Sequence, residues 1–361
     1  MTETPSLPVH HLLIPFAAVS SEAAVPHLQA LQLPNLRQLL DRLTLVHSDM
    51  GSDESFSPPH ERALARAQSL LAQETLIDGY IPWAAQEAAQ LGLKEADSAV
   101  WGWVSLCNYF VGTGSMTLED PAQLHVTEAE SRQLLADMTP YFVEDGITLH
   151  YVAPTRWLAT GAPLKDVRTA SLDRVVGRNL DAWQPEGQPA AEPPQDGLAP
   201  SGGSAAHTVA SVGVKSAAKL RRLQNEMQML LYTHTVNDAR SRAKTAAINS
   251  IWLHGTGALA TELAGDTAKV STNISLPRNL AVAALREDWA TWAQAWTQLD
   301  ATLCADWLKR VQAGEPVMLT LCGERSALTY ELRPKSGLER LKSSFTGIFG
   351  LQSAYLLPKQ L

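Results

Sequence analysis

Short apolar runs and helically spaced apolar residues succeed one another along this chain of 361 residues. Runs rich in Leu, Ile, Val and aromatic residues occupy positions 10–18, 99–112, 146–161 and 316–324. Apolar runs of this length, bounded by polar or turn-forming residues, are typical of buried strands. We therefore predict strands in these four segments, the third of them forming a single strand or a hairpin.

Other segments place apolar residues three and four positions apart, as the buried face of a helix requires. This spacing and the neighbouring start signals predict helices within residues 33–46, 59–71, 126–142, 216–234 and 285–311. The last segment carries a stripe that we interpret as a helix face buried in the core rather than as a ligand platform: Trp289, Trp292, Trp296, Leu299, Leu303 and Trp307.

Local start signals support the prediction of two of these helices. Thr127 is followed three residues later by Glu130, which is the capping-box pattern of a helix N-terminus. Pro34 suits the first turn of the helix in which it lies, because its fixed φ angle matches helical geometry there.

Two segments fit neither pattern of a packed core. Residues 184–210 are rich in Pro, Gly, Ala and Gln, and such a segment buries too little apolar area to offset its ordering entropy. We predict a disordered loop there. Residues 340–351 are amphipathic and predict either a contact helix or a packed terminal element.

Composition narrows the class of protein. With 45% hydrophobic and 18% charged residues, the chain is typical of soluble globular proteins with about two domains. The formal net charge of −8 provides no field that would attract nucleic acid or an anionic membrane. The three Cys residues are far apart and favour a reducing compartment. The N-terminal apolar run lacks a preceding basic segment and contains a Pro, so we expect a cytoplasmic protein.

Few familiar catalytic motifs occur: the sequence contains no HExxH, no P-loop and no GxSxG. His10 and His11 precede a buried strand and are expected to cap its end rather than to bind metal. The Ser- and Asp-rich loop at 48–62 leads into a predicted helix, where a hydroxyl could act as a nucleophile or contact a phosphate. Ser57 is the candidate nucleophile, and the alternative is a loop that only caps the helix.

A second polar concentration spans Thr233–Gly257, which places His, Asn and Arg residues before an Ile-Trp-Leu strand and a Gly-containing turn. Arg offers a fixed fork of donors to a carboxylate or phosphate, and Gly lets the backbone approach a ligand closely. This pattern predicts ligand-binding roles for His234, Asn237, Arg240 and Asn249. The alternative is a network that braces the junction between a helix and a strand.

The same stretch resembles a signature of the archaeal-type, cofactor-independent phosphoglycerate mutases. That family carries a His-Pro-Val-Asn…Arg segment, then Asn-x-Ile-Trp/Leu-Leu and a Gly-x-Gly turn; here Thr235 replaces the usual Pro. Weaker similarity covers roughly residues 100–260 and includes the strand-like segment with Arg156 and the turn with Asp173, to which the resemblance gives ligand-binding roles. The chain is also similar to bacterial proteins labelled phosphoglycerate mutase or regulatory protein.

The resemblance implies an α/β fold with an alkaline-phosphatase-like three-layer core, here expected to be reduced, and an inserted α+β domain. It places the core in residues 1–98 and 258–361 and the insertion in residues 99–257. In the family the core holds two divalent metal ions and a Ser nucleophile, and the insertion grips the phosphoglycerate.

The sequence departs from the family where metal ligands are expected. The first strand ends in "LLIPFAAVSS" in place of a Gly-Asp-Gly turn, and no carboxylate follows until Glu22. A late Asp-His-Ser-Thr-Pro turn is replaced by Glu324, Arg325 and Ser326. Because a guanidinium repels a cation that an imidazole would bind, we predict no metal ligands and no cofactor.

Three functional hypotheses follow. The first is a catalytically inactive, phosphoglycerate mutase-like protein with a regulatory or binding role, whose partner is a small phosphorylated or carboxylated ligand or a protein. The second is an active phosphotransferase or phosphohydrolase that uses Mn or Mg at a rearranged site drawn from Asp49, Asp53, His60, Glu61 and Glu324. The third is an interaction scaffold that binds a protein partner through the 184–210 loop and the C-terminal segment.

Overall fold

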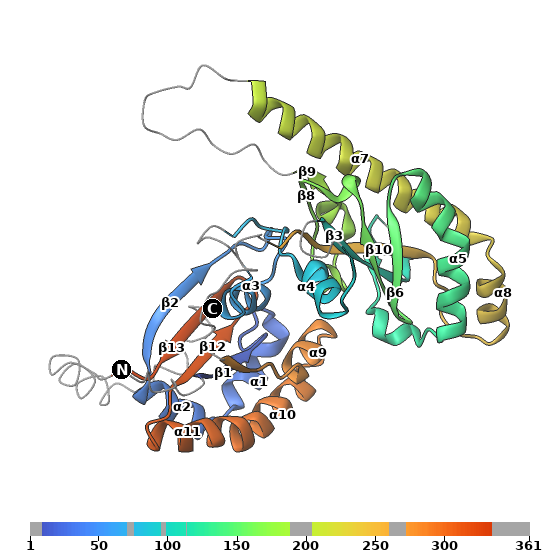
Figure 1. Cartoon of the computed structure of the whole chain (residues 1–361). Coiled ribbons are helices and arrows are strands. Elements are labelled where there is room, and N and C mark those ends of the chain that lie inside the picture. The colour runs from blue at the N-terminus through green and yellow to red at the C-terminus, as the bar shows by residue number, and fades with distance from the viewer. Residues whose placement is uncertain are drawn as a thin grey trace. The chain divides into compact units, whose positions relative to one another are not determined.

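The chain forms two compact units. The computed structural model describes residues 9–70, 76–94, 99–112, 114–187, 204–259 and 272–333, with side chains of the helix that begins at Ser204 described from position 213. The first unit combines Met1–Ser69 with Thr267–Leu361, and the second unit is Leu70–Asp266 (Figure 1). None of the helices in the described ranges is long and apolar enough to cross a membrane.

A mixed five-stranded sheet forms the centre of the first unit, in the order β11-β1-β12-β13-β2. Strands β11 (Thr272–Ser275), β1 (Val9–Ile14) and β12 (Val317–Cys322) run parallel. Strands β13 (Ser326–Glu331) and β2 (Thr44–Met50) continue the sheet in antiparallel pairing. The carboxyl ends of β1 and β12 therefore meet at one edge, which is where ligands bind in open α/β sheets.

Short helices surround this sheet. They are η1 (Glu22–Ala24), α1 (Val25–Ala30), α2 (Pro34–Arg42), α3 (Pro59–Ala67), α9 (Asn279–Leu285), α10 (Trp289–Leu299), the π-helical turn η6 (Asp300–Cys304) and α11 (Ala305–Gln312).

One face of the sheet packs on α2, α9, α10 and α11, and it contributes Leu12, Ile14, Leu319 and Leu321 to a large apolar core (Figure 1). The predicted tryptophan stripe is confirmed, since all four Trp side chains are at most 9% exposed and belong to this core. The opposite face packs on α3, where Leu13 and Cys322 contact Ala63. The first sheet is therefore covered by helices on both faces.

The second unit is built on an antiparallel four-stranded sheet in the order β10-β3-β7-β6. Its strands are β10 (Ser250–Gly257), β3 (Trp101–Cys107), β7 (Arg156–Thr160) and β6 (Thr148–Ala153). The segment predicted as a strand or a hairpin is the β6–β7 hairpin.

The remaining elements of the second unit are α4 (Trp83–Gln90), β4 (Tyr109–Val111), β5 (Met116–Leu118), η2 (Pro121–Leu124), α5 (Glu128–Glu144), η3 (Ala162–Leu164), β8 (Val167–Arg168), α6 (Leu172–Val175), η4 (Leu180–Trp183), β9 (Glu186–Gly187), α7 (Ser204–Tyr232) and α8 (Thr235–Arg242). The capping box predicted at Thr127 and Glu130 is present at the start of α5.

The two faces of the second sheet differ in character. Val104, Trp157 and Leu253 point into an apolar core shared with α5 and α7. Strand residues alternate between faces, so Trp103, Ser105, Arg156 and His254 share the opposite face. We call these four residues the polar face of the second sheet. Helix α4 packs on this side, against Trp101 and Leu158.

Three sequence predictions differ from the structure. Residues 44–50 form strand β2, although the helical leucine spacing continues to position 46 and a polar loop was expected beyond it. Residues 83–90, predicted in the core domain, belong to the second unit because α4 packs on its sheet. Of the predicted disordered loop, Glu186–Gly187 pairs with β8 and Ser204 begins α7, while positions 188–203 and the 340–351 segment lie outside the described residues.

Candidate functional site

The turn after β1 is held by hydrogen bonds that tryptophan side chains of the core donate to its carbonyls. Phe16 has a φ angle of +52°, a conformation uncommon for residues other than Gly. Its carbonyl accepts from Trp292 Nε1 at 2.9 Å, and the Ala17 carbonyl accepts from Trp296 Nε1 at 3.2 Å. The Ala17 amide donates to Cys322 at the end of β12, over 2.7 Å. After β1, this edge of the sheet therefore presents apolar side chains, and the carbonyls of Phe16 and Ala17 already accept hydrogen bonds from tryptophans.

Two carboxylates near the same edge have protein partners. Glu324, in the turn after β12, accepts from the amide of Ser20 at 3.0 Å and also from the Ser20 hydroxyl. Asp49, on β2, accepts from Arg62 Nε at 3.0 Å and from Arg66 Nη1 at 2.5 Å. Burial alone would raise the pKa of Asp49, but hydrogen bonds from Arg62 and Arg66 together with their charges hold it below the usual range.

Arg62 connects three parts of the first unit. Its side chain is only 6% exposed, and it donates to the carbonyl of Ser57 at 2.5 Å and to that of Arg325 at 3.1 Å. Ser57, the predicted nucleophile, lies in the loop before α3 and is 3% exposed. Arg325 pairs with the exposed Asp53 at 3.6 Å. A guanidinium thus occupies the space between the predicted nucleophile and the turn after β12.

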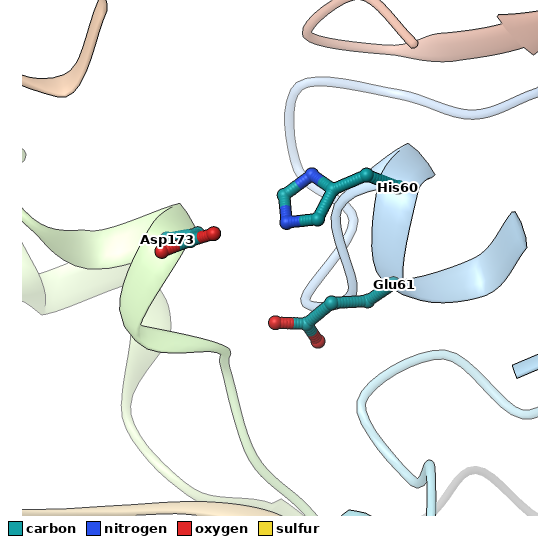
Figure 2. Close-up of side chains that lie close together, drawn as sticks. All are labelled: His60, Glu61 and Asp173. Atoms are coloured by element: carbon teal, nitrogen blue, oxygen red, sulfur yellow. The ribbon is translucent and has the colours of Figure 1, made fainter. Parts of the chain in front are cut away.

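His60 and Glu61 project from the first turn of α3 (Figure 2). The ring of His60 lies 5.8 Å from that of Phe16, and the His60 side chain is buried. Asp173, which the resemblance gives a ligand-binding role, lies on α6 in the second unit (Figure 2). Imidazole and carboxylate groups are both metal ligands in proteins.

The predicted ligand residues His234 and Asn237 hold the junction of α7, α8 and β10. His234 caps α8, its Nδ1 accepts from Val236, and its Nε2 lies 2.9 Å from Asp137. The amide of Asn237 donates to the carbonyls of Leu231 and Ile248 and accepts from the Ile248 amide, all within 2.8 Å. These contacts join the end of α7 to the start of β10.

Arg240 and Asn249, like His234 and Asn237, make hydrogen bonds to other parts of the second unit. The three side-chain nitrogens of Arg240, which is 4% exposed, donate to Ala246, Glu130 and Leu124. Asn249 bonds both the amide and the carbonyl of Tyr109, at 2.6 and 2.9 Å. For all four of these residues the geometry favours the bracing alternative over direct contact with a ligand, because their polar atoms are engaged by the protein.

Arg156 lies instead on the polar face of the second sheet. It is opposite Ser105 in the β3–β7 pairing, and its side chain is 39% exposed. Its Nη2 donates to Glu87 on α4 at 2.6 Å, and its guanidinium lies over the Trp103 ring, 5.1 Å from the centroid. Glu87 also accepts from the Trp103 indole at 2.5 Å. Arg156 Nε is buried and has no hydrogen-bond partner within the described ranges.

His254 adds a neutral imidazole to this face. Its Nε2 lies 3.0 Å from the hydroxyl of Ser105, and its ring centroid lies 5.2 Å from that of Trp103. Burial, assisted by the charge of Arg156 and opposed by that of Asp173, lowers the pKa of His254 to about 3. The ring is therefore neutral at physiological pH, and its tautomer decides which nitrogen donates.

The polar face thus gathers Arg156 and Asp173, which the sequence singled out, around residues that it did not. Asp173 is close enough to act on His254 through its charge. Glu87, Trp103 and Ser105 were not predicted, since their contacts with Arg156 and His254 join positions far apart in the chain. His254 lies inside the stretch Thr233–Gly257, where its alternation with Leu253 was the available signal.

Comparison with known proteins gives limited similarity. No protein-family model matches the chain, and no curated protein sequence matches it significantly. A cofactor-independent phosphoglycerate mutase from Thermoplasma acidophilum DSM 1728 is 11% identical over 92% of this chain and 90% of its own, with a TM-score of 0.35. The PH0037 protein from Pyrococcus horikoshii is 11% identical over 91% and 88%, with a TM-score of 0.38. Values this low establish neither the fold family nor the activity of this chain.

Proposed function

We propose that this protein binds a small phosphorylated or carboxylated molecule at the polar face of its second unit and does not transform it. In this proposal the first unit is an alkaline-phosphatase-like core without catalytic ions. The protein would then be a divergent, catalytically inactive relative of the cofactor-independent phosphoglycerate mutases, with a binding or regulatory role. The family resemblance of Thr233–Gly257 motivates the choice of ligand class.

The pairing of Asp49 with two arginines is the observation on which the absence of catalysis rests. A hard divalent cation needs oxygen ligands that carry negative charge and are not already neutralised. At Asp49 the two guanidinium groups supply the positive charge that an ion would otherwise bring. Glu324 is similarly engaged by Ser20. Binding an ion there requires breaking buried charge-assisted hydrogen bonds, which are among the stronger ones in proteins.

Arg156 supports the anion-binding half of the proposal. Its planar fork suits carboxylate and phosphate oxygens, and the side chain is 39% exposed, so part of the fork is accessible to a ligand. Stacking on Trp103 and the bond to Glu87 fix the direction of the fork, so little side-chain entropy is lost on binding.

Titration calorimetry with 3-phosphoglycerate, which carries both anionic groups, tests the binding role. We expect saturable binding by the full chain, and about tenfold or greater loss of affinity in Arg156→Gln, because hydrogen bonds to charged groups contribute about 1.5–3 kcal/mol each. Arg242→Gln is the matched control, since this Arg is exposed at the end of α8 in the same unit. Equal affinities of the two variants would contradict the site.

The placement of His60 and Glu61 in one turn of α3 favours a second candidate (Figure 2). In it the protein is a phosphotransferase or phosphohydrolase that uses Mn²⁺ or Mg²⁺ at a rearranged site. Calorimetry with Mn²⁺ alone distinguishes the two: this candidate requires saturable binding that His60→Ala weakens. The main proposal expects no such binding.

A further inference from the structure

The carboxylate of Glu87 lies directly against the guanidinium of Arg156 on the polar face of the second sheet. One of its oxygens accepts from Arg156 Nη2 at 2.6 Å, and the other accepts from the Trp103 indole at 2.5 Å. Both are short hydrogen bonds to a charged group, which places them among the stronger ones in proteins. The Glu87 side chain is only 19% exposed. This carboxylate is therefore a fixed part of the proposed anion site.

Helix α4 holds the backbone of Glu87 in place. Ala84, Ala85 and Ala88 are fully buried, and their small side chains belong to the cluster that packs the helix on the sheet. Glu87 lies three positions after Ala84 and one before Ala88, so it extends from the border of this packed helix face. Moving the carboxylate away from a ligand would require breaking both of its hydrogen bonds or shifting a packed helix.

A ligand reaches the guanidinium of Arg156 through its terminal nitrogens. Nε is buried, whereas the side chain as a whole is 39% exposed. Nη2 already donates to Glu87, and hydrogen bonds between a guanidinium and an oxyanion are about 2.7–2.9 Å long. An oxyanion bound at the terminal nitrogens therefore lies roughly 4–6 Å from the Glu87 carboxylate, a distance at which like charges repel.

The charges of this face disfavour a second negative charge on the ligand. Glu87 balances Arg156, so an approaching anion meets an ion pair without net charge. His254 is neutral at physiological pH, and the charge that acts on it from Asp173 is negative. A carboxylate brings one negative charge, whereas a phosphate monoester brings about 1.5 to 2 at pH 7. The repulsion from Glu87 is therefore larger for a phosphate, although the planar fork suits the oxygens of both groups.

We propose that Glu87 is the specificity-determining residue of this site and makes it select a carboxylate over a phosphate. The inference rests on the proposed function and specifies its ligand. Arg156 receives the carboxylate end of the ligand, and a phosphate at the other end lies away from the fork. The preferred ligand class is then a small carboxylic acid, with or without a phosphate.

Calorimetry with two three-carbon probes at pH 8 tests the preference in the full chain. Glycerate carries only the carboxylate, and glycerol 3-phosphate carries only the phosphate, as a dianion at this pH. We expect the unmodified protein to bind glycerate at least tenfold more tightly than glycerol 3-phosphate. At pH 5 the phosphate is a monoanion, because its second pKa is about 6, and the preference should fall to about threefold or less.

Substitution of Glu87 tests the cause of the preference. Glu87→Gln removes the charge and keeps the size of the side chain and one oxygen acceptor. We expect its affinity for glycerol 3-phosphate at pH 8 to rise about tenfold, and the difference between the two probes to shrink to about threefold or less. Glu144→Gln, at an exposed position at the end of α5 in the same unit, changes the net charge equally and should leave the preference unchanged.

The outcomes separate this inference from the proposed function. If 3-phosphoglycerate binds but glycerol 3-phosphate binds as tightly as glycerate, or if Glu87→Gln lowers the affinity for both probes, the inference is overturned and the anion site remains. If 3-phosphoglycerate and both probes fail to bind, the proposed function is overturned and the inference with it. Should Glu87→Gln not fold, the unmodified protein decides, since an equal preference at pH 8 and pH 5 overturns the inference.

Discussion

Arg62 shows how one side chain can determine which charges are available for a ligand at the edge of a sheet. Its guanidinium is almost fully buried, it neutralises Asp49, and it bonds the carbonyls of Ser57 and Arg325. A buried ion pair adds little net stability relative to an apolar pair, but removing one partner leaves an uncompensated buried charge. Arg62 therefore couples the stability of the first unit to the arrangement that we propose excludes ions.

This coupling predicts unequal effects for the two arginines on Asp49. Arg62→Leu should lower the free energy of unfolding of the first unit by about 3–5 kcal/mol, the usual consequence of breaking a buried pair. Arg66→Leu, whose side chain is 35% exposed, should lower it by about 1 kcal/mol or less.

Urea unfolding followed by hydrogen–deuterium exchange at the backbone amides of the first sheet measures the difference, because those amides report on the first unit alone, whereas tryptophans lie in both units. Equal losses in the two variants would show that Arg62 is not the residue that holds Asp49.

At the scale of elements, sequence patterns predicted the features that depend only on residues close together in the chain. The Thr127–Glu130 capping box and the tryptophan stripe are encoded within a few residues, and both are present. Strand β2 was missed because it is an edge strand whose Leu45 and Met50 are 49% and 71% exposed, so it lacks the alternation of a buried strand. Edge strands are specified by their pairing partner, which the sequence does not reveal.

The same limit applies to the candidate site. Arg156 was singled out by resemblance, but its contact with Glu87 joins residues 69 positions apart. His234, Asn237, Arg240 and Asn249 formed a recognisable cluster in sequence, yet whether such side chains brace backbone or bind a ligand depends on tertiary contacts. In the structure they hold β10, the strand that carries His254.

Asn237 tests this bracing interpretation. Asn237→Ala removes two donors and the acceptor for the Ile248 amide, so it should lower the free energy of unfolding of the second unit by about 1–3 kcal/mol. Asn225→Ala, at an exposed position on α7, should be neutral. Affinity of folded Asn237→Ala for 3-phosphoglycerate should change less than twofold; a tenfold loss without loss of stability would make Asn237 a ligand contact.

At the scale of the whole molecule, the two units have different chemical characters. The first unit directs Asp49 and Glu324 onto its own arginines and serine, and the second unit presents a partly exposed arginine on its polar face. Binding without turnover follows if the charges needed for catalysis are absent from the first unit and those needed for recognition are kept in the second. The central claim therefore concerns activity as much as binding.

Turnover of 3-phosphoglycerate by purified full-length protein supplied with Mn²⁺ is the most direct measurement of that claim. The account predicts no mutase or phosphatase product above the rate of the protein-free control, and the same result for Ser57→Ala. Robust turnover that Ser57→Ala abolishes would show that Ser57 is a working nucleophile and would contradict the account.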